Sequence, residues 1–295
     1  MSTYAAILFQ VLFAVSALGQ QIADTTFTFP IARPAYAFGQ GSVVAVDAAH
    51  NNFHTLDGRY APFGKVLAND GYRLVSNDVP LTPEALKTYR IFVISNPLDS
   101  SNTANWQLPT PSAFSDTEIS ALNTWVKAGG SLLLIADHMP FAGAAHDLAK
   151  SFGFDYLNCF AFDNRRRSLE RFSKSNGTLA SNALTQSIDT VITFTGSAFR
   201  IPPGAAPFLL LRDYTLLSPE VAWQFEENTP ATRGEGYYQG ASMSYGKGRV
   251  VVMGEAAMFT AQLSGPNRSP VGLNRPEARQ NNQLLLNIIH WLDGL

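Results

Sequence analysis

Cysteine is nearly absent from this sequence: its 295 residues include a single one, Cys159. A lone cysteine cannot form a disulfide within the chain, so the folded protein has to be stabilised by its hydrophobic core. Apolar residues surround Cys159 in the sequence, which indicates a buried thiol. No glycine-rich turn flanks it, so we do not expect it to act as a nucleophile.

An excess of positive charge is also missing. Lysine and arginine number 21 against 23 aspartates and glutamates, which gives a formal net charge of −2. Nucleic acid is therefore not an expected partner, because binding to phosphates requires clustered basic residues. The one basic run, residues 165–167, is short and is typical of a solvated turn.

Long apolar runs are missing after the first twenty residues. Residues 5–18 form one apolar stretch, which small residues at Ala17 and Gly19 close. This stretch is too short for a comfortable membrane span and is typical of a secretory signal peptide. We therefore expect residues 1–19 to be a signal peptide, the protein to be exported to the periplasm or secreted, and the mature chain to have no membrane span.

Short apolar strands alternate with helices through the first half of the chain. The patterns predict strands at residues 42–46, 72–76, 90–95 and 131–136, and helices at 63–70, 82–86, 116–128 and 144–152. In the later half, strands are expected at 191–195, 208–212, 235–245 and 249–253, and a closing amphipathic helix at 281–292. The turn Tyr245-Gly246-Lys247-Gly248 indicates a hairpin.

This order of elements predicts an α/β fold. Alternating strands and helices imply a mostly parallel central sheet with helices on both faces, here followed by a β-rich C-terminal elaboration. Residues 20–40 are expected to form an extended lead-in, and residues 41–295 a single domain. The polar loop at residues 100–115, which contains Trp106, is either a lid or an exposed insertion.

Four of the five histidines fall in two short segments, DAAHNNFHTLDG (residues 47–58) and ADHMPFAGAAH (136–146). Each segment starts where a predicted strand ends, and a third strand ends at Glu255. In open parallel sheets the carboxyl ends of the strands share one edge, where ligands bind. The sequence therefore predicts a histidine and carboxylate site at this edge.

Two kinds of chemistry suit such a site. Two or three imidazoles with a carboxylate can bind a divalent metal such as zinc, and the expected ligands are His50, His54 and His138. Alternatively, the same groups serve acid and base chemistry without a metal. The candidate residues are Glu255, His138 and Asp47 for catalysis and Asn51, Asn52 and Trp106 for substrate binding.

Structural roles compete with each of these interpretations. Asp47 and Asp137 can cap the helices that follow their strands, and the two asparagines can satisfy backbone groups of their loop. His146 is expected to be a surface or packing residue. His290 lies among apolar residues of the last helix, where packing is the expected role.

Three long segments resemble the DUF4350-type proteins: VVAVDAAHNNFHTLDGRYAPF, SLLLIADHMPFAGAA and YGKGRVVVMGEAAMFT. The resemblance covers about residues 41–293, including the ending NNQLLLNIIHWL. It implies the class I glutamine-amidotransferase-like, flavodoxin-like fold, and no established reaction. The amidotransferases of that superfamily carry a cysteine at the sharp turn after a central strand. The corresponding turn here, Ala136-Asp137-His138-Met139, has none, so glutamine hydrolysis by that mechanism is not expected.

Three functions remain open from the sequence. The first is an exported hydrolase, either metal-assisted or metal-free, that acts on a small or carbohydrate-like substrate. The second is a non-catalytic module that binds such a ligand, with Trp106 supplying a stacking surface. The third is a structural partner in the cell envelope. Close approach of His50, His138 and Glu255 would favour the hydrolase.

Overall fold

The computed structural model describes residues 21–165 and 169–295. The predicted signal peptide and two members of the basic run, Arg166 and Arg167, lie outside the described residues. No helix within the described ranges is long and apolar enough to cross a membrane.

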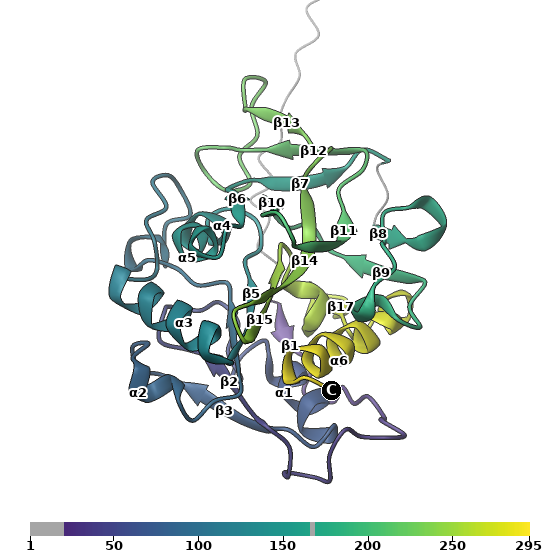
Figure 1. Cartoon of the computed structure of the whole chain (residues 1–295). Helices are drawn as coiled ribbons and strands as arrows, with labels where there is room; N and C mark the ends of the chain where they lie inside the picture. The colour runs from purple at the N-terminus through teal and green to yellow at the C-terminus, as the bar shows by residue number, and fades with distance from the viewer. Residues whose placement is uncertain (1–20, 166–168) are drawn as a thin grey trace, which may run out of the picture.

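Five parallel strands form one side of the largest sheet, from its edge strand inward (Figure 1). They are β2 (Val43–Asp47), β3 (Arg73–Asn77), β4 (Ile91–Ser95), β5 (Ser131–Ile135) and β15 (Gly248–Met253). Their spatial order is β3-β2-β4-β5-β15. Counted along the chain this is the order 2-1-3-4-5 of flavodoxin-like folds. The four strands predicted in the first half of the sequence are therefore confirmed, and the predicted flavodoxin-like topology agrees with the strand order.

Beyond β15 the sheet becomes antiparallel, so it is mixed rather than mostly parallel. The added strands are β14 (Tyr238–Tyr245), β10 (Ala198–Arg200), β6 (Asp155–Leu157) and β11 (Ala206–Leu210). β14 pairs with β15 through the predicted hairpin, with Tyr245 opposite Gly248. A two-residue hairpin can only join antiparallel strands, and this connection changes the direction of the sheet.

Helices cover both faces of the sheet, as predicted. They are α1 (Ala61–Asn69), α2 (Pro83–Leu86), α3 (Asp116–Ala128), α4 (Phe141–Ala144), α5 (His146–Ser151) and α6 (Arg279–Asp293). Alternate residues of the strands face opposite sides: Val44 and Val46 pack with α1 and α6, whereas Ala45 packs with α3 and α5. Figure 1 shows α6 and α3 on opposite sides of the sheet.

Smaller sheets make up the remaining β structure. They contain β1 (Ile22–Ala23), β16 (Ala261–Ser264) and β17 (Ser269–Gly272) in one, β7 (Phe160–Asp163), β12 (Tyr214–Leu217) and β13 (Ala231–Arg233) in a second, and β8 (Glu170–Ser173) and β9 (Thr190–Thr193) in a third. The lead-in is thus not merely extended, because β1 pairs with β16. Most of these strands are too short for a hydrophobic period to identify them.

The observed limits of one predicted helix agree with the sequence-based expectation, and those of another differ from it. Ser115 and Glu118 form a capping box at the start of α3, which has the predicted limits. The helix expected at residues 144–152 is instead two short helices, α4 and α5, separated at Ala145.

Candidate functional site

A cavity of about 330 Å³ lies where β2, β4 and β5 end. Polar side chains at its wall are Gln21, His54, Arg59, Asn96, Asp137, His138, Gln262 and Ser264; apolar ones are Phe53, Trp106, Phe141, Phe194, Trp223, Ala257 and Val271. A larger hollow of about 600 Å³ next to the start of α6 has no histidine or carboxylate in its wall. We take the smaller cavity as the candidate site because it alone of these two holds groups that can transfer protons.

The ring of His138 is fixed in one orientation. Its Nδ1 lies 2.7 Å from the carbonyl oxygen of Met139. A carbonyl oxygen can only accept, so Nδ1 carries the proton and the Nε2 of the neutral ring holds a free lone pair. The ring stacks on Phe160 at 4.4 Å between centroids and meets the edge of Trp223 at 4.8 Å. These contacts hold the ring of His138 in the cavity wall.

His54 lies in the same cavity and is almost fully buried, with 3% of its surface exposed. Within the described residues neither ring nitrogen has a hydrogen-bond partner, and Nδ1 is sealed from solvent. Burial lowers the pKa of His54 to about 3, with smaller contributions from the charges of Arg59 and His138. The imidazole is consequently neutral at ordinary pH.

Asp137 supplies a carboxylate to the cavity. The side chain of Asn96, at the end of β4, accepts a hydrogen bond of 2.8 Å from the backbone N–H of Asp137. Asp137 Oδ1 in turn accepts one from the backbone N–H of His138 at 2.8 Å. These contacts between adjacent strand ends hold the carboxylate and the imidazole in one turn.

Aromatic rings form much of the remaining wall. Trp106 meets Phe53 at 5.4 Å and Phe141 at 5.1 Å, both edge to face. Trp223 stands at the mouth with 46% of its surface exposed. Flat aromatic faces of this kind bind apolar ring surfaces, and sugar rings have such faces.

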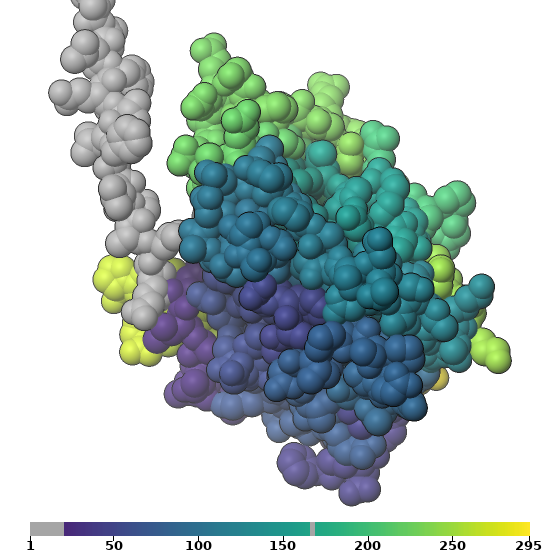
Figure 2. Space-filling model, turned by 90° about the vertical axis from the view of Figure 1, so that its left-hand side faces the viewer, coloured from purple at the N-terminus to yellow at the C-terminus, as the bar shows by residue number. Residues whose placement is uncertain are grey.

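Trp106 and Trp223 belong to two loops that are bonded to each other. Gln107 and Val221 form an antiparallel bridge, and Leu108 N–H donates to the carbonyl of Glu220. Ala222 N–H donates to the carbonyl of Trp106. Figure 2 shows the blue-to-teal surface of the first loop below the green surface of the second.

The same loop, at residues 100–115, is also anchored to α4. Asn158 accepts a bond from the backbone of Gly143 and donates one to the hydroxyl of Thr110. A side chain at Gly143 would place its Cβ 2.0 Å from that hydroxyl, so glycine is required for this close contact. The loop is thus attached on both sides in this structure.

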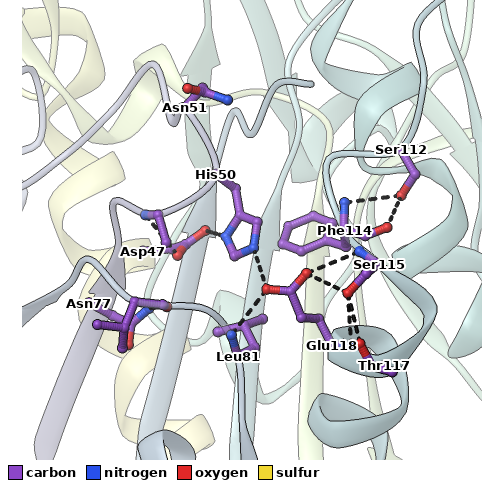
Figure 3. A network of polar contacts seen from close by, with 12 residues as sticks. Asp47, His50, Asn51, Asn77, Leu81, Ser112, Phe114, Ser115, Thr117 and Glu118 are labelled. Atoms are coloured by element: carbon purple, nitrogen blue, oxygen red, sulfur yellow. Dashed lines mark hydrogen bonds and ion pairs between the residues drawn. The ribbon is translucent and has the colours of Figure 1, made fainter. Parts of the chain in front are cut away.

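His50, although only four residues from His54, belongs to a different polar network (Figure 3). Its Nδ1 lies 2.7 Å from Asp47 Oδ2 and its Nε2 lies 3.1 Å from Glu118 Oε1. Ionised carboxylates only accept hydrogen bonds, so both ring nitrogens donate and the ring is an imidazolium. Burial lowers the pKa of His50, but the two carboxylates outweigh this effect and raise it above 6.5. His50 thus links the end of β2 to the start of α3.

Asn51 and Asn52 bond to their own surroundings rather than to the cavity. The side-chain amide of Asn51 donates to the carbonyl of Leu98, and that of Asn52 to the carbonyl of Ser95. Asn51 also has a positive φ of 47°, a conformation that asparagine tolerates better than most residues. Both shape the loop that connects β2 to His54.

Glu255 is fully buried and lies outside the cavity wall. Its two oxygens accept hydrogen bonds of 2.8 Å from the backbone N–H groups of Ala257 and Met258. Burial raises the pKa of Glu255 well above its ordinary value, and the charge of Asp137 raises it further. Glu255 therefore caps the short turn that brings Ala257 to the cavity.

The two remaining histidines also have local partners. His146, about two-fifths exposed, pairs with Asp147 and Asp155. His290 Nε2 lies 2.6 Å from Asp70 Oδ2, so a partly buried hydrogen bond adds to the packing expected for it. Cys159 is buried as expected, and burial raises the pKa of its thiol to about 12.

The structure therefore brings together only part of the predicted site. His54, His138 and Trp106 share the cavity, whereas Asp47, His50, Asn51, Asn52 and Glu255 do not line it. The three histidines considered as one of two alternatives for a divalent metal such as zinc are not brought together either. Such a site takes three protein ligands, and no three His, Cys, Asp or Glu side chains are grouped for one within residues 21–165 and 169–295.

Among the cavity residues that were not predicted as site residues, Arg59, Asp137 and Trp223 matter most for its chemistry. Arg59 lies five residues after His54, and Asp137 precedes His138 at the end of a predicted strand, where a helix cap was the competing structural role. Trp223 lies in a loop with no motif, so nothing in the sequence connects it with Trp106. Only the pairing of the two loops reveals it.

Comparison with known proteins identifies the fold and no activity. No family model and no curated protein matches the chain. Among solved structures, the mmIFT52 N-terminal domain is 14% identical and has a TM-score of 0.60, with 85% of this chain and 98% of that domain covered. At this identity the likeness shows the fold alone.

Two bacterial structures are more distant. A cytoplasmic protein from Salmonella typhimurium LT2 is 14% identical with a TM-score of 0.49, covering 85% of this chain and 98% of that one. A ThuA-like protein from Bacteroides uniformis ATCC 8492 is 12% identical with a TM-score of 0.47, covering 90% and 94%. At these TM-scores neither structure supports a family or a function for this chain. The resemblance to DUF4350-type proteins stays unconfirmed.

Proposed function

We propose that the cavity is the active site of a metal-free hydrolase for a small, carbohydrate-like molecule, with His138 as its general base. The observation that carries the proposal is the hydrogen bond between His138 Nδ1 and the carbonyl of Met139, which leaves Nε2 free to accept a proton. The aromatic wall supports a ring-shaped ligand, because such rings stack on tryptophan and phenylalanine.

The proposed reaction uses water. His138 Nε2 takes a proton from a water molecule while the water oxygen bonds to the acyl carbon of an ester, and the bond between that carbon and the leaving oxygen then breaks. The same nitrogen then returns the proton to the leaving oxygen, so the histidine is regenerated. Asp137 orients the water or a ligand hydroxyl, since an ionised carboxylate accepts hydrogen bonds.

A non-catalytic binding module is the second candidate. It is favoured by the composition of the cavity, in which aromatic side chains outnumber carboxylates. In such a module the imidazole of His138 would accept a hydrogen bond from a sugar hydroxyl and would transfer no proton.

The variant His138→Gln separates the two candidates. Glutamine keeps hydrogen-bonding capacity but cannot act as a base near neutral pH. For the hydrolase we expect at least a hundredfold loss of kcat on nitrophenyl esters, with little change in KM. His146→Gln is the matched control, because His146 lies outside the cavity. Absence of turnover in the unmodified protein, with ligand binding intact, would favour the module.

Export is part of the same proposal. It is supported by the apolar stretch of residues 5–18 and the small residues that follow it. Sequencing the N-terminus of the protein after expression tests it, and a start near Gln20 is the expected result.

A further inference from the structure

Arg59 is the only arginine or lysine in the cavity wall, among the described residues, and it lacks a carboxylate partner. No nitrogen of Arg59 lies within 4.0 Å of a carboxylate oxygen in the described residues. The undescribed residues, 1–20 and 166–168, contain no aspartate or glutamate that could supply one. The guanidinium is thus without an ion pair from its own chain.

The surroundings of Arg59 make its lack of an ion pair unusual. Its side chain is partly buried and its guanidinium carbon lies 4.0 Å from the centroid of the Phe53 ring. One terminal nitrogen donates weakly to the carbonyl of Phe53 at 3.4 Å, and the buried Nε has no partner. Burial lowers the pKa of this guanidinium. A charge withdrawn from water without a partner is destabilising, so such groups normally meet a counter-charge.

His54 faces the same space and has the same deficit. Only 3% of the surface of His54 is exposed, and its ring has no hydrogen-bond partner in the described ranges. Because Nδ1 is sealed from solvent, the favoured tautomer of His54 carries its proton on Nε2. In this tautomer the buried Nδ1 has only an unpaired lone pair, and Nε2 is an N–H donor. Arg59 and His54 together therefore offer donors, and Asp137 is the one carboxylate in the described part of the wall.

We infer that the cavity binds a small molecule with an anionic group, such as the carboxylate of an acidic sugar, which Arg59 holds with help from His54. Arginine suits this role because its planar donors match the two oxygens of a carboxylate. The ring of the ligand would lie among the aromatic side chains, and Asp137 would accept hydrogen bonds from its hydroxyls. The inference rests on the proposed function in taking this cavity as the ligand site.

Isothermal titration calorimetry with glucuronate, glucose and acetate tests the inference. We expect glucuronate to bind about 10- to 100-fold more tightly than glucose, the range for hydrogen bonds to charged groups. Arg59→Gln should abolish the difference, and Arg59→Lys should restore part of it. Arg233→Gln, on the exposed strand β13, is the matched control and should change nothing. Thermal unfolding of each variant verifies folding.

The outcomes separate this inference from the proposed function. Equal binding of glucose and glucuronate, unaffected by Arg59→Gln, would overturn the anionic ligand and leave the carbohydrate site in place. Binding of acetate that depends on Arg59, without binding of either sugar, would support the anion site and overturn the carbohydrate-like ligand. Binding of none of the three would overturn both.

Discussion

His50 and His54 stand four residues apart in one loop, yet their surroundings are opposite. Both ring nitrogens of His50 bond to carboxylates, so every polar atom of that ring is satisfied by the protein. His54 is equally buried and has no such partner among the described residues. Buried polar groups are nearly always paired in folded proteins. This contrast is the reason why we assign the first histidine a structural role and propose a ligand-binding role for the second.

The largest expected effect concerns stability. His50→Gln leaves the fully buried Asp47 without its charged partner, and removing one member of a buried pair costs about 3–5 kcal/mol. His138→Gln, on the cavity side, should cost about 1 kcal/mol, since it loses one hydrogen bond. Urea unfolding of both variants measures the two losses. Equal losses would remove the distinction between a structural and a ligand-binding histidine.

A second test uses pH. The folded-state pKa of His50 is raised above 6.5, so its contribution to stability is complete below pH 6.5 and disappears as pH rises through the raised value. Burial raises the pKa of Glu118, but hydrogen bonds from Ser115, His50 and Leu81 N–H outweigh this and lower it from 4.5 to about 2. Its contribution is complete above pH 4.5 and disappears towards pH 2. The network should therefore stabilise the protein most between these limits.

Glu118→Gln checks this pH dependence directly. We expect a loss of about 2 kcal/mol at pH 5.5, the value for a hydrogen bond to a charged group, and a smaller loss at pH 2.5. The free energy of unfolding, measured across this range for the variant and the unmodified protein, gives the difference curve. A loss that stays constant with pH would show that the charge of Glu118 has no role.

The smallest effect is expected at the mouth of the cavity. Trp223 has a positive φ of 66°, a conformation that glycine adopts without strain. Trp223→Gly should therefore leave stability nearly unchanged while it weakens ligand binding by about 1 kcal/mol, or roughly fivefold. Calorimetry with glucuronate measures the change in affinity. Unchanged affinity would place the ligand away from the loop of Trp223.

The sequence predicted the parallel half of the molecule well because those strands are continuous apolar runs. The strands Ile91–Ser95 and Ser131–Ile135 are buried on both faces. Their sequences therefore form apolar runs and do not alternate between apolar and polar residues. The antiparallel strands β6 and β10 are three residues long, too short to show a period. Their existence depends on contacts with distant strands.

The candidate site was predictable only where a residue follows a clearly predicted strand. His138 follows a clear strand, so its place at the carboxyl edge could be expected from topology. The separation of His50 from His54 could not, because it depends on Glu118, 68 residues further on. Arg59 carries no sign in the sequence that it lacks an acidic partner. Unpaired groups become visible only when all neighbours are placed.

The bridge between Gln107 and Val221 limits how the binding specificity of the cavity can be altered. The two loops that carry Trp106 and Trp223 hold each other in register through backbone hydrogen bonds. An insertion or deletion in one loop displaces the other, so neither can be exchanged alone without disturbing the opposite wall. Grafting a new specificity onto this scaffold requires both loops to be transplanted as a pair.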